Sequence, residues 1–291
     1  MHSLALSERL GAEIYLKLEN WQKTGSFKVR GAFHRLLLLS PEERRRGVVT
    51  ASAGNHGLGV AYAARQVHAE ACVVVPVAAS AAKVAALQQL GVQLVQQGVD
   101  YDEAEQVARE MQERDRRVFV HAFSDPEIIA GQGTVGLEVM HDLPAAELIL
   151  VPVGGGGLIS GVAVAAKSLS PGVRVVGVQS EASPAMVRAL AVGHNIETPI
   201  GPTIADGLAG RFVSPATLEL TRRFVDEVVL VSEEAIVEAM RLVLEAEHML
   251  VEGSASVGVA ALLEKRVAPG ARTVVVLTGR NVDTEVLKKI L

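Results

Sequence analysis

Eight short runs of aliphatic residues recur along the chain and constrain its fold more than any other feature of the sequence. Each run is rich in valine, isoleucine and leucine, and longer amphipathic or alanine-rich segments separate most of them. Near-continuous aliphatic strands that alternate with helices are typical of a parallel sheet buried on both faces. We expect strands at residues 48–52, 71–76, 92–95, 117–122, 147–153, 173–179, 227–232 and 273–279.

The segments between these runs predict helices of uneven length. Uneven helices argue against the eight regular repeats of a barrel and favour open, doubly wound α/β sheets. A chain of 291 residues, 49% of them hydrophobic, is long enough for two such domains or one large one. We expect helices at residues 57–67, 80–90, 101–115, 157–169, 232–249 and 256–266.

Charge and cysteine content exclude several classes of protein. A formal net charge of −5 gives no basic surface of the kind that nucleic acid requires. The single cysteine, Cys72, cannot form an internal disulfide and lies in a predicted strand, where an inert core thiol is expected. The sequence shows no secretory leader and no unbroken apolar run of about 18 residues, so we expect no membrane partner and a cytoplasmic location.

Lys28 lies in a turn of small residues, TGSFKVRGA at 24–32, directly before an apolar run that predicts a helix. For a lysine alone, a solvated cation is the simpler interpretation. Here Gly25 and Ser26 allow close approach of a ligand, while Phe27 supplies an apolar wall. Desolvation lowers the pKa of a lysine toward the range in which its amine attacks a carbonyl group. Lys28 is therefore a candidate nucleophile.

Ligands of open parallel sheets bind at the carboxyl ends of the strands, so the loops there are the places to search for chemistry. After the strand at 48–52, the residues AGNHG place Asn55 and His56 at a helix start. The backbone N–H groups of such a turn attract a carboxylate or phosphate. An ordinary glycine turn, with Asn55 as the helix cap, is an equally good interpretation.

Four consecutive glycines follow the strand at 147–153. Each glycine lowers the stability of the fold by about 0.5–1 kcal/mol relative to alanine, because glycine loses more chain entropy on folding. A loop whose backbone N–H groups bind a phosphate therefore explains the four glycines better than a simple connection between two elements. Ile159 and Ser160 break the G-x-G-x-x-G fingerprint, and the sequence contains no phosphate loop of the G-x-x-x-x-G-K type, G-x-S-x-G elbow or H-E-x-x-H motif. The glycines are Gly154, Gly155, Gly156 and Gly157.

The remaining motifs suit a cofactor that has a phosphate for the glycine loop and an aldehyde for the lysine, and a substrate whose carboxylate binds the loop with Asn55 and His56. Pyridoxal phosphate with an amino-acid substrate meets all three requirements. Thr278, at the end of the last predicted strand, can bond a pyridine nitrogen or simply cap the next helix.

Six stretches of the chain resemble, in the same order, the fold-type II pyridoxal-phosphate enzymes, in particular the branch of serine/threonine dehydratases and serine racemases. The resemblance extends from residue 16 to residue 283. The stretches are LKLENWQKTGSFKVRGAF (16–33), TASAGNHGLGVAYAA (50–64), IIAGQGTVGLEV (128–139), VPVGGGGLISGVA (151–163), TIADGLA (203–209) and VVVLTGRNVD (274–283).

The resemblance implies a role for each candidate residue. Lys28 corresponds to the Schiff-base lysine, with Phe27 beside the cofactor, and Asn55 to the residue that bonds the phenolic oxygen. The four glycines correspond to the phosphate cup, and Thr278 to the hydroxyl beside the pyridine nitrogen. A neutral hydroxyl does not hold the pyridine protonated, which makes loss of a β-leaving group the natural outcome. Ser52, Asn55 and His56 are implied to bind the substrate carboxylate.

These roles imply a dehydratase, or ammonia-lyase, that converts a small L-β-hydroxy amino acid, first L-threonine or L-serine, into a 2-oxo acid and ammonia by α,β-elimination. The alternatives are a hydroxyaspartate or phenylserine dehydratase, an enzyme similar to serine racemase, and a cofactor-binding protein without turnover. Ala53 replaces the second base of the racemases and favours the dehydratase. Arg280 replaces a glycine that is usual in the family, and this departure is the reason to keep the alternative of a cofactor-binding protein without turnover.

The family also implies an architecture and a partner. We expect a large cofactor-binding domain of residues 1–46 and 125–291, a small inserted α/β domain of residues 47–124, the cofactor in the cleft between them, and a homodimer. Glu181 corresponds to one ligand of a divalent-cation site found in some relatives, but Val187 stands where a second carboxylate is expected. We therefore expect no metal.

Overall fold

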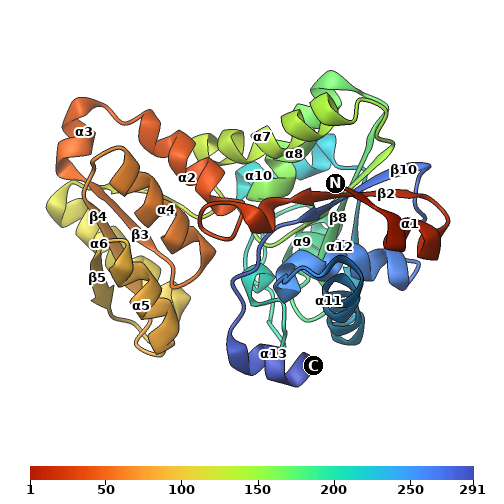
Figure 1. Ribbon diagram of the computed structural model, residues 1–291. Coiled ribbons are helices and arrows are strands. Elements are labelled where there is room, and N and C mark those ends of the chain that lie inside the picture. The colour runs from red at the N-terminus through yellow and green to blue at the C-terminus, as the bar shows by residue number, and fades with distance from the viewer. The chain divides into compact units, whose positions relative to one another are not determined.

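The computed structural model describes residues 1–291, which form two compact units. The larger unit consists of residues 1–25 and 132–291, and the smaller of residues 26–131. Each unit has its own largely parallel sheet with helices (Figure 1), which confirms the predicted fold class. The smaller unit contains the segment 47–124 and extends beyond it at both ends. The domain boundaries expected from the sequence stay a prediction.

The sheet of the smaller unit has four parallel strands in the order β5-β4-β3-β6. All four were expected from their aliphatic runs. They are β3 (Val48–Ala51), β4 (Ala71–Val75), β5 (Gln93–Gln96) and β6 (Val118–Phe119). The helices of this unit are α2 (Lys28–Leu37), α3 (Pro41–Arg46), α4 (Asn55–Gln66), α5 (Ala81–Gln89) and α6 (Tyr101–Asp115).

Helices cover both faces of this sheet. On one face α4 and α5 pack their apolar residues against β4, and α2 packs against α4. On the other face α6 contributes Ala104, Ala108 and Met111 to a cluster with Val49 and Cys72. Cys72 is fully buried, as expected for a core thiol. Burial on both faces leaves the loops at the strand ends as the places where polar side chains gather.

The sheet of the larger unit has six strands in the order β1-β2-β10-β7-β8-β9, and every pair except β1–β2 is parallel. Four of these strands were expected: β7 (Leu148–Pro152), β8 (Arg174–Ser180), β9 (Glu227–Val231) and β10 (Arg272–Leu277). The other two, β1 (His2–Ser3) and β2 (Glu13–Leu18), were not. In Figure 1, β2 from the start of the chain (red) lies beside β10 from near its end (blue).

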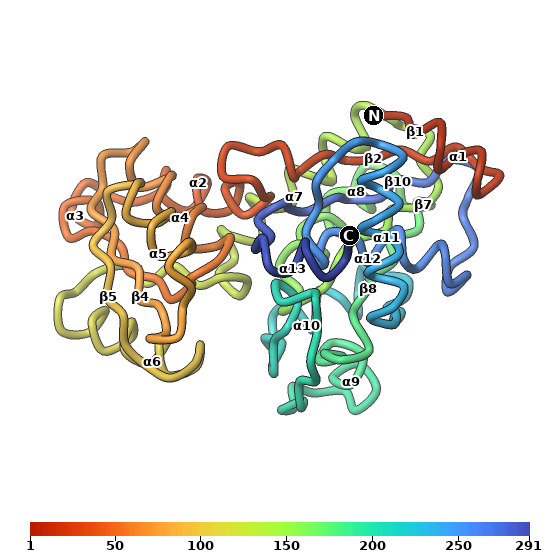
Figure 2. The backbone as a smooth tube through the Cα atoms, turned by 60° about the horizontal axis from the view of Figure 1, so that its bottom comes forward, coloured from red at the N-terminus to blue at the C-terminus, as the bar shows by residue number.

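The helices of the larger unit include two that pack together on one side of its sheet. On one side of the sheet α12 lies against β7 and β10, and α11 packs alongside α12 (Figure 2). Residues 253–262 of α12 are all buried, which explains why this segment carries only small and apolar residues on every side. The helices are α1 (Leu4–Leu10), α8 (Gly157–Leu169), α9 (Ala185–Val192), α10 (Pro215–Phe224), α11 (Glu233–Glu247), α12 (Gly253–Leu263) and α13 (Thr284–Ile290).

A further helix, α7 (Pro126–Asp142), spans the sequence boundary between the two units, and two short 3-10 turns lie at residues 19–21 and 206–208. None of the helices combines the length and the apolar character needed to cross a membrane.

The central position of β7 generates a stability prediction. Leu150 of β7 is fully buried, whereas Leu137 of α7 is 46% exposed. Replacing Leu150 by alanine should lower the free energy of unfolding by about 2–5 kcal/mol, because it removes buried methyl groups and leaves a cavity. Leu137→Ala is the matched control and should stay within about 0.5 kcal/mol of wild type. Urea unfolding followed by circular dichroism and by the fluorescence of Trp21 measures both, and equal losses would contradict the assignment of the core.

Candidate active site

Lys28 is the first residue of α2 and is half-buried. Its Nζ donates a hydrogen bond to the carbonyl oxygen of Ala122 at 2.9 Å and lies 5.4 Å from the centre of the Phe27 ring. A Cβ on Gly59 of α4 would come within 3.1 Å of the Lys28 carbonyl carbon. The glycine therefore lets α4 approach α2 closely at the residue that carries the candidate nucleophile.

The loop after β3 is shaped by Ser52 and two glycines. The Ser52 hydroxyl accepts a hydrogen bond from the Gly54 N–H at 3.1 Å. A Cβ on Gly57 would lie only 2.2 Å from the Ser52 carbonyl oxygen, so this position excludes any side chain. No side chain caps the start of α4. Backbone N–H groups at such a helix start are suited to a negatively charged ligand.

His56, in the first turn of α4, is buried and electrically neutral. Its Nε2 lies 3.0 Å from the carbonyl oxygen of Val120, which assigns the ring proton to Nε2 and leaves Nδ1 as a buried acceptor without a partner. Burial, followed by the nearby charge of Lys28, lowers the pKa of His56 to about 3. The imidazole thus carries no positive charge with which to attract a carboxylate. Its predicted part in substrate binding stays a prediction, and the backbone N–H groups of α4 are the better donors.

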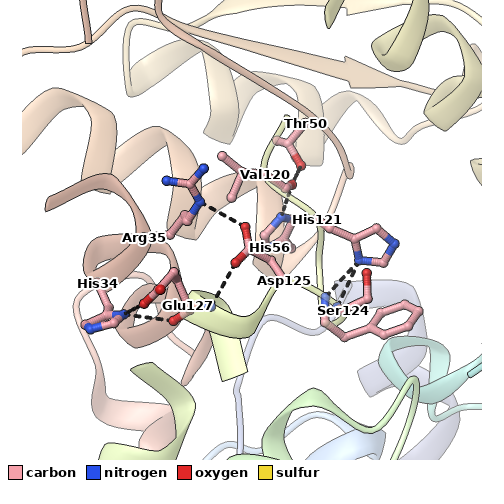
Figure 3. A network of polar contacts seen from close by, with 10 residues as sticks. His34, Arg35, Thr50, His56, Val120, His121, Ser124, Asp125 and Glu127 are labelled. Atoms are coloured by element: carbon pink, nitrogen blue, oxygen red, sulfur yellow. Dashed lines mark hydrogen bonds and ion pairs between the residues drawn. The ribbon is translucent and has the colours of Figure 1, made fainter. Parts of the chain in front are cut away.

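Residues 120–125, which follow β6, form a fixed segment that the sequence reasoning missed. The carbonyl oxygen of Val120 accepts hydrogen bonds from the Thr50 hydroxyl at 2.8 Å and from His56. The carboxylate of Asp125 binds Nε of Arg35 at 2.9 Å. Figure 3 shows Arg35 pointing to Asp125, and Thr50 and His56 pointing to the Val120 carbonyl oxygen. The available signal was the polar stretch HAFSD at the carboxyl end of a predicted strand.

In the larger unit, the four glycines connect β7 to α8. Gly156 has φ +94°, and a Cβ there would come within 2.6 Å of the Met186 Cε and 2.9 Å of the Thr217 Cβ. No side chain caps α8, whose first main-chain bond runs from the Ser160 N–H to the Gly156 carbonyl oxygen. The loop therefore presents backbone N–H groups at the start of a 13-residue helix, which is the chemistry of an anion site.

Thr278 directly follows β10 and is only 3% exposed. Close to it lies a buried carboxylate that the sequence reasoning also missed, that of Glu252. Its Oε2 accepts a hydrogen bond from the Asn281 N–H at 3.0 Å, and a Cβ on Gly279 would lie 2.7 Å from its Oε1. The sequence signal was a charged residue directly before α12, a helix that contains no charged residue.

Arg280, which departs from the family pattern, and Glu181, the candidate cation ligand, both have partners within the larger unit. The guanidinium of Arg280 lies 4.8 Å from the ring centre of Trp21, in the range of a cation–π contact. The carboxylate of Glu181 pairs with Arg266 at 2.9 Å. The chain contains no group of three or more histidine, cysteine, aspartate or glutamate side chains placed to hold a metal ion.

Comparisons with known proteins show similarity along the whole chain. A family model described as "Pyridoxal-phosphate dependent enzyme" matches residues 1–279. An L-threonine ammonia-lyase from Thermotoga maritima is 48% identical over 290 residues, which cover 100% of this chain and 72% of the relative. The catabolic L-threonine dehydratase of Escherichia coli is 39% identical over 287 residues, covering 98% of this chain and 87% of the relative.

Solved structures give the same picture. The processed form of threonine deaminase isoform 2 from Solanum lycopersicum matches with a TM-score of 0.95 and 34% identity, covering 100% of this chain and 85% of the other. Maize serine racemase matches with a TM-score of 0.94 and 35% identity, covering 99% of this chain and 89% of the other.

The close approach at Gly57 predicts the direction in which Gly57→Ala changes the free energy of unfolding. By helix propensity alone, Gly57→Ala should stabilise α4 by about 1 kcal/mol. Because its Cβ would collide with the Ser52 carbonyl oxygen, we expect a loss of about 1–3 kcal/mol in the free energy of unfolding instead. A Cβ on Gly54 meets nothing within 4 Å, so Gly54→Ala is the matched control. Urea unfolding of the two variants decides, and a more stable Gly57→Ala variant would contradict the described turn.

Proposed function

Because the chain belongs to the family of pyridoxal-phosphate dependent enzymes, in the branch of serine and threonine dehydratases, we propose that it is a lyase acting on L-threonine. The reaction eliminates water from the β-hydroxy amino acid and then adds water back to release ammonia, so the net products are a 2-oxo acid and ammonia. L-Serine is the second substrate in the proposal. The observation that carries it is the 48% identity to an L-threonine ammonia-lyase over 290 residues, in a chain that retains Lys28 at the start of α2.

The donor groups of the chain fit each part of the cofactor. The uncapped start of α8 and the left-handed Gly156 suit a phosphate, and the Lys28 amine suits an aldehyde. The buried hydroxyl of Thr278 suits a pyridine nitrogen that stays unprotonated. We propose that these residues, together with Phe27 and Asn55, bind pyridoxal phosphate.

When bound, pyridoxal phosphate supplies the electron withdrawal that makes the α-hydrogen of an amino acid acidic and allows a β-hydroxyl group to leave. The chain must supply the remaining functions. The Lys28 amine takes the α-hydrogen, and the Ala122 carbonyl holds that amine in place when it is free. The backbone N–H groups at the start of α4 and the Ser52 hydroxyl bind the substrate carboxylate, which orients the α-hydrogen toward Lys28.

Elimination is favoured over racemisation by the side chains present. A racemase needs a second base on the opposite face of the α-carbon, and Ala53, at the position of that base in the similar racemases, has no group that moves a proton. The neutral Thr278 works in the same direction, because its hydroxyl would not hold the pyridine nitrogen protonated, which favours loss of the β-hydroxyl group.

A homodimer and a cytoplasmic location complete the proposal. The prevalence of twofold assemblies supports the dimer, which light scattering on the purified protein tests. A single buried cysteine fits a reducing compartment.

The role of Lys28 leads to a direct prediction. Lys28→Ala should lower the release of 2-oxo acid from L-threonine by about 100- to 10,000-fold, because it removes the group that moves the α-hydrogen. Lys289→Ala, on the exposed face of α13, is the matched control and should keep wild-type turnover. Both are measured on cofactor-loaded protein with a panel of L- and D-β-hydroxy amino acids. Failure of the wild type to release 2-oxo acid from any member would contradict the proposed function.

A further inference from the structure

We propose that His121 is a positioning residue of the reaction. Its ring caps the turn of residues 121–124 and thereby aims the Ala122 carbonyl oxygen at the amine of Lys28. The inference rests on the proposed function for its catalytic consequence, but the cap itself is a property of the smaller unit alone. No role for His121 was expected from the sequence.

The geometry of the cap is specific. Nδ1 of His121 lies 3.1 Å from the backbone nitrogen of Phe123 and 3.1 Å from that of Ser124, and both N–H groups donate to it (Figure 3). An acceptor that bonds the N–H groups two and three residues ahead acts as aspartate and asparagine side chains do in turns. Because Nδ1 accepts two bonds, the ring proton is assigned to Nε2.

The cap orients the peptide group that receives Lys28. The Phe123 N–H and the Ala122 carbonyl belong to one planar trans peptide, so they point in opposite directions. When His121 holds the N–H, the carbonyl oxygen is turned the other way, where Lys28 Nζ donates to it at 2.9 Å. The orientation of one peptide plane therefore links the imidazole to the amine that moves the α-hydrogen.

The ring itself is held by its neighbours. Phe123 packs edge-on against it with ring centres 4.6 Å apart, and Phe119 does so at 6.1 Å. The side chain is 16% exposed and lines a hollow of about 570 Å³ in the smaller unit. Protons from solvent thus reach a ring whose orientation is fixed by packing.

Several charged groups surround the His121 ring and act on its pKa in opposite directions. Burial, the largest cause, lowers the pKa of His121, and the positive charges of Arg109 and Lys28 lower it further. The carboxylates of Glu105 and Asp125 oppose this change. Oε1 of Glu105 lies 4.0 Å from Nε2 of His121. The remaining titratable groups near the ring or its hollow are Arg35 of α2, Glu43 of α3, Glu127 of α7, Tyr101 of α6 and the neutral His56 of α4.

Protonation would remove the cap. A proton on Nδ1 abolishes the acceptor for the Phe123 and Ser124 N–H groups. Since the pKa of folded His121 is below the ordinary value of 6.5, the ring is mostly neutral at that pH, and the cap is lost as the pH falls through the lowered pKa. Turnover should therefore decline on the acid side as the neutral fraction of His121 declines.

Two variants separate the acceptor from the bulk of the ring. His121→Ala removes the acceptor, and we expect kcat to fall about tenfold with KM changed less than about twofold, because Lys28 is misplaced while substrate binding remains. His121→Asn restores an oxygen that accepts from the same two N–H groups, and it should recover kcat to within about threefold of wild type. Because asparagine does not titrate, the ratio of its kcat to that of wild type should rise as the pH falls through the lowered pKa of His121.

Measurements on the cofactor-free protein test the cap without turnover. Nitrogen chemical shifts should place the His121 ring proton on Nε2, and amide exchange at Phe123 and Ser124 should be about tenfold faster in His121→Ala than in wild type or His121→Asn. If His121→Ala does not fold, the ring tautomer of wild-type His121 and the amide exchange and kcat of His121→Asn still test the proposal. The proposal would be overturned by amide exchange at the wild-type rate in His121→Ala or by a ring proton on Nδ1 of wild-type His121. An equal loss of kcat in His121→Ala and His121→Asn would also overturn it. A wild type without turnover would contradict the proposed function while leaving these readouts intact.

Discussion

Burial of parallel strands on both faces is the constraint on which the rest of the structure depends. Strands such as β3, β4 and β7 are covered by helices on both sides and have no exposed face that could carry polar chemistry. Polar and flexible residues are therefore concentrated in the loops at the carboxyl ends of the strands. Each candidate site segment follows a strand of one sheet or the other: the loop with Asn55 and His56, residues 120–125, the four glycines and Thr278.

Within these loops, backbone groups and neutral side chains carry much of the proposed chemistry. Gly57 and Gly156 occupy positions where a Cβ would collide with neighbouring atoms, and each lies at the start of a helix without a side-chain cap. Both histidines of the smaller unit that lie nearest Lys28 have lowered pKa values and hold the chain in place through neutral rings. In this account the amine of Lys28 does the proton transfer, and its surroundings serve mainly to hold it.

The sequence predicted those features that depend on local patterns. The eight aliphatic runs became strands, with β3, β4 and β7 buried on both faces, and the four glycines connect a strand to a helix as their composition indicated. The strand β2 was missed because Ile14 and Leu16 alternate with polar residues, a weaker pattern whose meaning comes from pairing with β10. Glu252, His121 and the neutral state of His56 depend on burial and on contacts with distant residues, which no local pattern encodes.

The central claim is that Lys28 is the residue that binds the cofactor covalently. The most direct measurement is borohydride reduction of the protein loaded with pyridoxal phosphate, followed by digestion and mass spectrometry of the peptides. The account predicts that the reduced cofactor is attached to the peptide that contains Lys28 and to no other lysine. Attachment elsewhere, or no attachment to protein that has bound the cofactor, would contradict it.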